Sequence, residues 1–342
     1  MMTDKPVLVT GGGGFLGAKI CSQLIHKGYS VRSFSRKVYP GLQKIGVECV
    51  QGDLRDSTAV NNAVKGCGSV IHNGAIAGIW GRKDHYLGIN VQGTKNVIEA
   101  SKAYGIQHLV YTSSPSVVAR NQDLSGADET LAYSDKYYSW YSYSKSQAES
   151  LVLGSHGDQG LCTVALRPHL IWGPGDPHFL PRILEKSRQK RLFRLGSTEN
   201  LVDVIFVDNA ASAHISALEA MSQSRFSGGG QAFFLGQEKP VNLWDFLDQL
   251  LLNSGEKPLA PHPKLSFKQA WNIGMVLEGL YKMLRIYDRD PPMTRFLAMQ
   301  LCRSHFFSHA KAADQIGYHP EISIDQGLEL LKKSHRLHLI NC

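Results

Sequence analysis

The feature that most constrains this 342-residue chain is a run of glycines placed between a short apolar segment and an amphipathic one. Residues 7–10 read Val-Leu-Val-Thr, which predicts a short buried strand. Apolar residues then recur at helical spacing between residues 15 and 25, and Gly28 stands where a C-terminal helix cap is expected. This strand–turn–helix unit is typical of parallel sheets that bind a nucleotide where the first helix begins.

Each of three glycines in the turn has a separate physical role. The first permits the tight turn, the second lets the backbone approach a pyrophosphate, and the third lets helix and strand pack closely. The helix N-terminus offers free N–H groups and a partial positive charge to the phosphates. A merely structural turn is the alternative, and the flanking strand and helix argue against it. The predicted dinucleotide-binding residues of this unit are Gly11, Gly14, Phe15, Leu16 and Gly17.

Strand-like and helix-like segments alternate through the first half of the chain. Strands are expected at 31–34, 47–50, 69–72 and 108–112, and helices at 57–65 and 84–104. This alternation predicts an α/β fold, a doubly wound parallel sheet of the Rossmann type covered by helices on both faces.

The order loosens at a loop rich in glycine and proline, residues 172–177. We therefore expect residues 1–170 to form the nucleotide-binding domain with the catalytic residues. Residues 171–342 should form mainly a smaller C-terminal substrate lobe, with segments near 200–220 returning to the Rossmann core. A strand pair is expected near residues 202–207.

The residues after the second strand bear on the choice of nicotinamide cofactor. That strand ends in Ser35-Arg36-Lys37, where an NAD-binding unit would carry an acid for the ribose 2′-hydroxyl. Arginine and lysine suit a 2′-phosphate, so the sequence favours NADP(H) over NAD(H), with ordinary surface charges as the alternative. Asp53 and Leu54, after the third strand, are expected to meet the adenine ring.

A tyrosine and a lysine four residues apart, Tyr141 and Lys145, would share one face of a helix. An ammonium beside a phenol lowers its pKa, which suits the tyrosine to acid–base catalysis, and Lys145 can also hold the nicotinamide ribose. Ser114, or its neighbour Ser113, ends a strand and could polarise a substrate oxygen. Asn90 could complete a proton path through water to Lys145. Alone, the Tyr–Lys spacing is usually a surface pair, but the ordered combination is specific.

Composition excludes several other classes of function. Six dispersed cysteines and fourteen histidines without ligand spacing predict neither a disulfide framework nor a metal site. The net charge of +8 is dispersed and lacks a nucleic-acid-binding motif, so a solvated basic surface is expected and no nucleic-acid partner. The first apolar run is too short for a signal peptide, and no segment is long enough to span a membrane, which predicts a cytoplasmic protein.

Over most of its length the chain resembles the extended short-chain dehydrogenase/reductase family. Its 3β-hydroxysteroid dehydrogenase branch is indicated by residues 111–114, 166–168 and 173–176. Within that branch the chain is similar to the 2-alkyl-3-oxoalkanoate reductases of bacterial long-chain olefin biosynthesis, at residues 79–81, 90–100, 171–176 and 292–297. One departure is His-Asn-Gly-Ala at 72–75, where such enzymes often have two alanines, beside the expected cofactor.

The resemblance implies roles for particular residues. It makes Ser114, Tyr141 and Lys145 a catalytic triad with Asn90 as a fourth member, and adds Tyr141, Lys145 and Pro168 to the cofactor contacts. The implied reaction is NADPH-dependent reduction of a long-chain, lipid-like 2-alkyl-3-oxoalkanoate to the 3-hydroxy acid. The resemblance also implies a homodimer formed through the helices that carry Asn90 and Tyr141, and association with other enzymes of the pathway.

Three other functions remain open from the sequence: a 3β-hydroxysteroid or sterol dehydrogenase, a sugar-nucleotide epimerase or reductase, and a non-catalytic NADP-sensing protein. The apolar segment 265–286, with charges interspersed at Lys268, Glu278, Lys282 and Arg285, argues against sugars. That segment is expected to pack as core helices, with a lipid-accepting cleft or peripheral contact with a membrane surface as alternatives.

Overall fold

The computed structural model describes residues 5–197 and 199–340, with side chains up to Ser334. Its centre is a seven-stranded, fully parallel sheet in the order β11-β7-β5-β4-β1-β2-β3. These strands are β1 (Val7–Thr10), β2 (Val31–Ser35), β3 (Glu48–Gln51), β4 (Ser69–His72), β5 (His108–Thr112), β7 (Cys162–Pro168) and β11 (Gln231–Leu235). The expected doubly wound α/β fold is confirmed.

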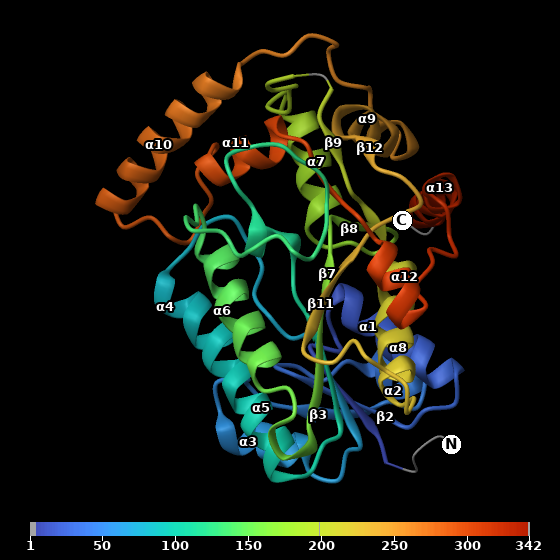
Figure 1. The fold of residues 1–342 in the computed structure, drawn as a ribbon. Helices are drawn as coiled ribbons and strands as arrows, with labels where there is room; N and C mark the ends of the chain where they lie inside the picture. The colour runs from blue at the N-terminus through green and yellow to red at the C-terminus, as the bar shows by residue number, and fades with distance from the viewer. Residues whose placement is uncertain (1–4, 198, 341–342) are drawn as a thin grey trace.

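Helices cover both faces of the sheet, as Figure 1 shows, and each face has its own apolar core. One layer contains α3 (Ser57–Val64), α4 (Lys83–Tyr86), the π-helical segment η1 (Leu87–Gln92), α5 (Gly93–Ala103) and α6 (Trp140–Gly154). The opposite layer contains α1 (Phe15–His26), α2 (Pro40–Lys44), α8 (Val207–Met221) and α12 (Ala310–Ile316). Because both faces are covered, the central strands β1 and β4 are buried along their whole length, whereas β3 at the edge is partly exposed.

The C-terminal lobe packs around a separate core that includes the buried rings of Trp172 and Trp244. Its helices are α7 (Phe179–Arg188), α9 (Leu243–Asn253), α10 (Phe267–Met283), α11 (Arg295–Cys302) and α13 (Ile324–Ile340). Its strands are β8 (Ile171–Trp172), β9 (Leu201–Val202), β10 (Ile205–Phe206) and β12 (Val241–Asn242), with β6 (Leu124–Ala127) and β13 (His305–Phe307) completing a four-stranded sheet. Two 3₁₀ turns, η2 (Pro115–Val118) and η3 (Asp158–Gly160), complete the elements.

Two expectations from the sequence need correction. The strand pair expected near 202–207 is wrong, because β9 pairs with β12 and β13 whereas β10 pairs with β8. The helix expected at 84–104 is present but is interrupted by the π-helical segment η1. The expected end of α1 is confirmed, since the helix stops at His26 and Gly28 takes a positive φ of 82°.

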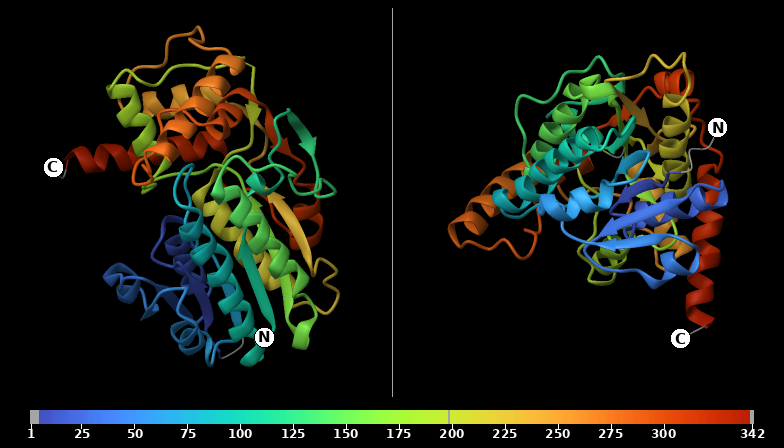
Figure 2. Two further views of the ribbon diagram at one scale, coloured as in Figure 1. Left: turned by 90° about the vertical axis from the view of Figure 1, so that its left-hand side faces the viewer. Right: turned by 90° about the horizontal axis from the view of Figure 1, so that it is seen from below.

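Parts of the second half of the chain return to the first. Helix α8 packs along α1, and β11 pairs in parallel with β7 as an outer strand of the large sheet. The sequence indicated a return near 200–220 but did not indicate β11. Figure 2 shows the two regions stacked, with the lobe above the sheet's carboxyl edge. Among the described residues, no helix combines the length and apolarity needed to cross a bilayer.

Candidate active site

The glycine turn is built for close backbone approach. Gly11 has a φ of 67°, and a Cβ there would lie 2.8 Å from the Cα of Gly74. A Cβ on Gly17 would lie 2.2 Å from the carbonyl oxygen of Gly11, so helix and strand could not pack as they do. Gly14 faces open space apart from that oxygen, and α1 begins after it without a side-chain cap. The first N–H groups of α1 are therefore available to an anion, and these residues fit a dinucleotide pyrophosphate.

The residues that follow β2 lie beside this turn. The hydroxyl of Ser35 accepts a hydrogen bond from the N–H of Gly13 at 3.2 Å. Arg36 and Lys37 are exposed, as expected for residues that would reach a ribose phosphate. Tyr39 was not expected here, yet its ring lies so close that a Cβ on Gly13 would be 1.9 Å from it. Only its position a few residues after β2 could have indicated this contact.

Asp53 and Leu54 lie at the end of the third strand, near the start of α5. Arg55 forms an ion pair with Asp53 at 2.7 Å, and this hydrogen bonding lowers the pKa of the Asp53 carboxyl to about 2. Leu54 packs against Gly93, where an added Cβ would lie 2.8 Å from the Leu54 Cβ. Both residues hold well-defined positions, and their contact with an adenine ring stays a prediction.

Tyr141 lies on the first turn of α6, which begins after the capping residue Ser139. Burial raises the pKa of Tyr141, and the nearby hydroxyl of Ser114 opposes this only in part. The lowering of this pKa by Lys145 stays a prediction. Ser113 is buried, and its hydroxyl has no hydrogen-bond partner among the described residues, so Ser114 is the serine that meets the tyrosine.

Lys145 is buried beneath the site. Its Nζ donates a hydrogen bond to the carbonyl oxygen of Thr112 at 2.5 Å and lies 4.3 Å from the ring centroid of Tyr111. Burial lowers the pKa of Lys145 to about 7, against the charge of Glu149 one turn further along α6. Glu149 in turn pairs with Arg167 at 2.6 Å. The lysine therefore faces a backbone carbonyl and a neutralised carboxylate.

Asn90 lies in the π-helical segment, a geometry frequently found at functional sites. Its Oδ1 accepts from the N–H of Ile76 at 2.8 Å, and its Nδ2 donates to the Ile76 carbonyl at 3.0 Å. The same Nδ2 donates to the Ser144 hydroxyl at 2.9 Å. The side chain thus clamps the loop after β4 onto α6, and its part in a proton path to Lys145 stays a prediction.

A buried chain of hydrogen bonds joins the glycine turn to Asn90. Thr10 bonds His72 Nδ1 at 2.7 Å, His72 Nε2 bonds Thr94 at 2.9 Å, and Thr94 donates to the Asn90 carbonyl at 2.6 Å. Because the Thr94 hydroxyl already donates its hydrogen bond to the Asn90 carbonyl, it accepts from His72 Nε2. The Nδ1 atom of His72 is therefore the acceptor of the bond from Thr10. Burial lowers the pKa of His72 to about 3, which keeps the ring neutral. Sequence reasoning missed this role of His72.

A second buried histidine comes from the second half of the chain. His214 on α8 bonds the Thr112 hydroxyl through Nε2 at 2.7 Å and the Ala210 carbonyl through Nδ1 at 2.7 Å. Burial lowers its pKa to about 4. Thr112 therefore links Lys145 to a helix distant in sequence, and no local pattern could have indicated this.

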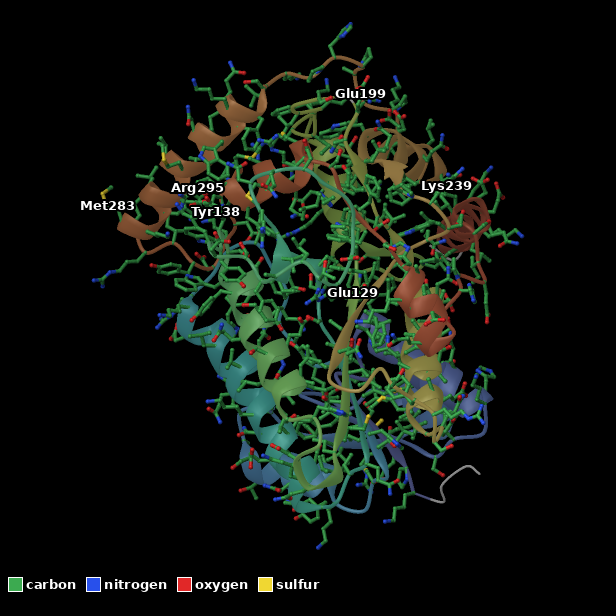
Figure 3. The ribbon with its side chains drawn as sticks, in the orientation of Figure 1. Glu129, Tyr138, Glu199, Lys239, Met283 and Arg295 are labelled. Carbon is green, nitrogen blue, oxygen red and sulfur yellow. The ribbon has the colours of Figure 1, made fainter. Side chains whose placement is uncertain are left out.

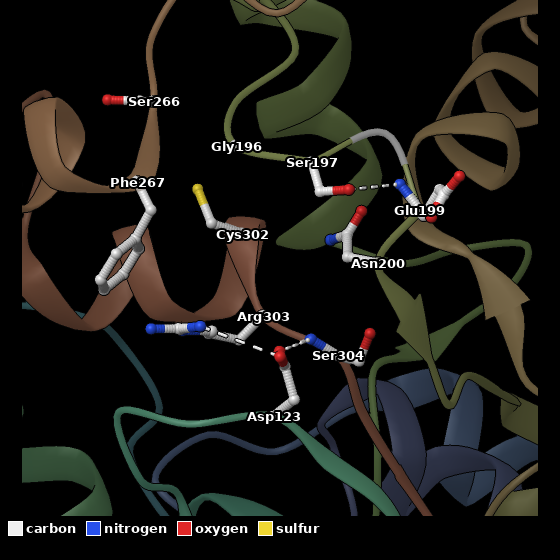
Figure 4. A pocket seen from close by; sticks show the side chains of 10 residues that line it. All are labelled: Asp123, Gly196, Ser197, Glu199, Asn200, Ser266, Phe267, Cys302, Arg303 and Ser304. Atoms are coloured by element: carbon white, nitrogen blue, oxygen red, sulfur yellow. Dashed lines mark hydrogen bonds and ion pairs between the residues drawn. The ribbon is translucent and has the colours of Figure 1, made fainter.

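Pro168 ends β7 and pairs with Leu235 of β11. His169 follows it and bonds His305 at 2.6 Å, both rings being buried. A separate cavity of about 410 Å³, away from Tyr141, lies in the lobe between Asp123 and Phe267 (Figure 4). The catalytic, glycine-turn and second-strand residues named from the sequence therefore lie along the carboxyl edge of the sheet, whereas this cavity does not contact them.

Solved structures share this fold. The crystal structure of gox2253 superimposes with a TM-score of 0.79 at 26% identity, over 98% of this chain and 99% of that one. A UDP-glucose 4-epimerase from Thermotoga maritima, solved with UDP-glucose, gives a TM-score of 0.74 at 19% identity over 98% and 99%. The second likeness shows the fold alone.

Relatives of known name are more informative. A 2-alkyl-3-oxoalkanoate reductase of Stenotrophomonas maltophilia is 45% identical over 96% of this chain and 98% of that protein. A reductase of the same name from Shewanella oneidensis is 41% identical over 95% of this chain and 85% of that protein. A mouse sterol-4-alpha-carboxylate 3-dehydrogenase is 32% identical over 95% and 89%. The model of the 3-beta hydroxysteroid dehydrogenase/isomerase family matches residues 8–263, and this chain is a member of that family of extended short-chain oxidoreductases.

Proposed function

We propose that this oxidoreductase reduces 2-alkyl-3-oxoalkanoates to the corresponding 3-hydroxy acids with NADPH. The observation that carries the proposal is the pair of reductases of that name, 45% and 41% identical over nearly the whole chain. The positions of Lys145 and Ser114 support it, since Lys145 bonds the Thr112 carbonyl at the end of β5 and Ser114 follows that strand, at the edge where such folds bind ligands.

The glycine turn and the start of α1 would hold the cofactor's pyrophosphate. Gly11, Gly14 and Gly17 leave the space for it, and the N–H groups of Phe15 and Leu16 face it at the helix terminus. Lys145 would hold the nicotinamide ribose, with Pro168 beside the ring. When bound, the reduced nicotinamide supplies the hydride to the substrate's carbonyl carbon.

Tyr141 would donate the proton to the developing alkoxide. Burial raises its pKa, so the phenol is protonated at neutral pH, as a proton donor in the direction of reduction must be. Ser114, whose hydroxyl lowers the pKa of the same phenol, would polarise the carbonyl oxygen. Asn90 would act by fixing the loop at Ile76 against α6, which holds the wall of the site in place.

The preference for NADPH over NADH is part of the proposal. Arg36 and Lys37 are exposed at the end of β2, beside the Ser35 hydroxyl that bonds the glycine turn. A 2′-phosphate in that position would form charge-assisted hydrogen bonds with them.

A second candidate is oxidation of a 3β-hydroxysteroid or sterol. The match to the 3-beta hydroxysteroid dehydrogenase/isomerase model and the mouse sterol dehydrogenase at 32% identity favour it. The same tyrosine, serine and lysine would serve, with the hydride moving in the opposite direction.

Turnover followed by nicotinamide absorbance separates these functions. We expect oxidation of a 2-alkyl-3-hydroxy acid with NADP⁺ and no reaction with a 3β-hydroxysteroid. Oxidation of the steroid alone would replace the proposed function by the second candidate. Tyr141→Phe should bind NADPH normally and lose turnover. If neither the unaltered protein nor this variant turns over either substrate, the protein is a cofactor sensor.

We also propose a homodimer through η1 and α6. A shallow hollow of about 350 Å³ on this face is lined by Leu87, Val91 and Tyr143 among others. Light scattering should give the mass of two chains, and Val91→Glu should give one. A single-chain mass for the unaltered protein would refute the dimer without bearing on the chemistry.

A further inference from the structure

The outward face of α10 is apolar although it faces solvent. Ile273, Val276, Leu280 and Met283 recur at helical spacing with 40%, 65%, 41% and 73% of their surface exposed. Leu284, just beyond the helix, continues this stripe. Figures 1 and 2 place α10 at the edge of the lobe, and Figure 3 shows Met283 at its outer tip. We call the five residues the apolar stripe.

The apolar stripe is not the face by which α10 packs against the protein, because the opposite face of the helix makes those contacts. A Cβ on Gly274 would lie 2.6 Å from the backbone of Thr294, so the helix lies directly on the start of α11. Glu278 is buried and pairs with Arg295 at 2.6 Å. Figure 3 shows Arg295 on the inner side of α10. The helix is therefore fixed with its apolar stripe outward.

The charges on this helix have one sign on the outside. The two charged residues that α10 exposes are Lys268 and Lys282, and its carboxylate, Glu278, is buried in the ion pair. Arg285 adds a further exposed positive charge beyond the helix, and the neighbouring Asp288 and Arg289 offset each other. The ammonium of Lys282 lies 5.9 Å from the ring centroid of Trp80, so Lys268 and Arg285 are the remaining exposed cations of this segment. An apolar stripe on a segment whose exposed charges are mainly positive matches a surface that is apolar inside and anionic at its boundary.

The inner face of α10 connects to the catalytic segments. The ring of Trp271 lies 4.9 Å from that of Tyr138, three residues before Tyr141. The ring of Tyr281 lies 6.1 Å from that of Trp80, in the loop whose position Asn90 fixes. A lipid that enters beneath α10 would therefore arrive beside the catalytic tyrosine.

We propose that the apolar stripe of α10 seats this protein on an anionic lipid bilayer, from which the long-chain substrate enters beneath the helix. The substrate part rests on the proposed function, whereas the surface itself rests on exposure and charge. A bilayer accounts for both the stripe and the exposed positive charges of Lys268 and Arg285, because the stems of such side chains can lie along the apolar layer while their charged groups meet lipid phosphates.

Sedimentation of the full chain with lipid vesicles tests the proposal. Vesicles of equal parts phosphatidylcholine and phosphatidylglycerol should carry the protein down, and vesicles of phosphatidylcholine alone should carry down much less. The double change Val276→Glu with Met283→Glu should lower the vesicle partition coefficient at least ~10-fold, because two side chains no longer enter the apolar layer. Lys268→Gln should weaken binding to the anionic vesicles ~5-fold. It should not increase binding to vesicles of phosphatidylcholine alone.

Leu252→Glu is the matched control, since Leu252 on α9 is 51% exposed but lies outside the stripe. It should leave the partition coefficient unchanged. Absence of binding to anionic vesicles, or equal loss in the control, would overturn the proposal. Light scattering tests whether a second copy of the chain covers the apolar stripe instead of a bilayer. A dimer that the double change dissociates would also overturn the bilayer proposal.

Turnover of a short-chain, water-soluble 2-alkyl-3-oxo acid separates this proposal from the proposed function. The double variant should keep that turnover while losing vesicle binding. If the unaltered protein binds vesicles but reduces no such acid, the proposed function fails and the bilayer surface stands. If it reduces the acid but ignores the vesicles, the reverse holds.

Discussion

The Rossmann region and the C-terminal lobe each contain a buried glutamate, and the two differ in what surrounds them. Glu149 on α6 pairs with Arg167 of β7, and both side chains are almost completely buried. Glu278 on α10 is equally buried, but its partner Arg295 remains partly exposed. The first pair lies between a helix and the central sheet, whereas the second fastens a peripheral helix to α11.

The two regions also differ in how their other polar and apolar groups are placed. In the Rossmann region buried Thr10, His72, Thr94 and Asn90 form continuous hydrogen bonds from the glycine turn to Ser144 on α6. In the lobe, α10 leaves an apolar stripe exposed. The comparison indicates that the Rossmann region is closely constrained by buried hydrogen bonds, while the lobe leaves an apolar face exposed.

Glu149→Gln should cause the largest loss of stability. It leaves the guanidinium of Arg167 buried without a countercharge, which costs about 3–5 kcal/mol in the free energy of unfolding. Urea denaturation measures this loss. Glu219→Gln, which breaks an exposed pair with Lys27 in the same region, should cost less than about 1 kcal/mol.

The same measurement on Glu278→Gln sharpens the comparison. Its partner can still reach solvent, so we expect a smaller loss than for Glu149→Gln. Equal losses for the two variants would contradict the difference between the regions.

Acid should destabilise the protein through its buried histidines. A histidine in the unfolded chain has a pKa of 6.5, whereas that of folded His214 is about 4 and that of His72 about 3. As pH falls from 6.5 toward 4, the unfolded chain takes up protons that these folded rings do not, so stability falls. His214 should account for a loss of about 3 kcal/mol.

This share is isolated by comparing variants. The difference in unfolding free energy between pH 7 and mildly acid pH should shrink in His214→Gln and stay unchanged in His26→Gln, since His26 is exposed. An identical pH dependence in both variants would show that His214 does not remain neutral in the folded state.

Arg36→Ala should change cofactor choice with little effect on stability. Loss of one charge-assisted hydrogen bond to a 2′-phosphate should raise the KM for NADPH ~10-fold and leave that for NADH nearly unchanged. Steady-state kinetics with each cofactor checks this. Equal changes in both constants would refute the NADPH assignment.

Val276→Ser should have the smallest effect on folding. The side chain is mostly exposed on α10, so the free energy of unfolding should change by less than about 0.5 kcal/mol. Urea denaturation without lipid checks this. A loss above 1 kcal/mol would mean that the stripe packs within the chain, and the two regions would no longer differ.

Much of the Rossmann region could be predicted because its signals are local. The glycines between β1 and α1 are required by short-range contacts, such as the one between Gly17 and the Gly11 carbonyl. Tyr141 and Lys145 come from one helix, so their spacing alone places them on one face. The partner of Lys145 could not be predicted in this way, because the carbonyl of Thr112 belongs to a strand 33 residues earlier.

The amino-acid sequence by itself determined the first five strands of the sheet, the glycine turn and the Tyr141–Lys145 spacing, since periodicity and spacing within a few turns of chain decide them. Tertiary structure alone decided the neutral states of His72 and His214, the return of β11 and the outward direction of the stripe on α10. The burial of a side chain and the choice of its partner depend on which distant segments come into contact. An apolar segment has the same sequence pattern whether it packs in a core or lies at a solvent-exposed edge.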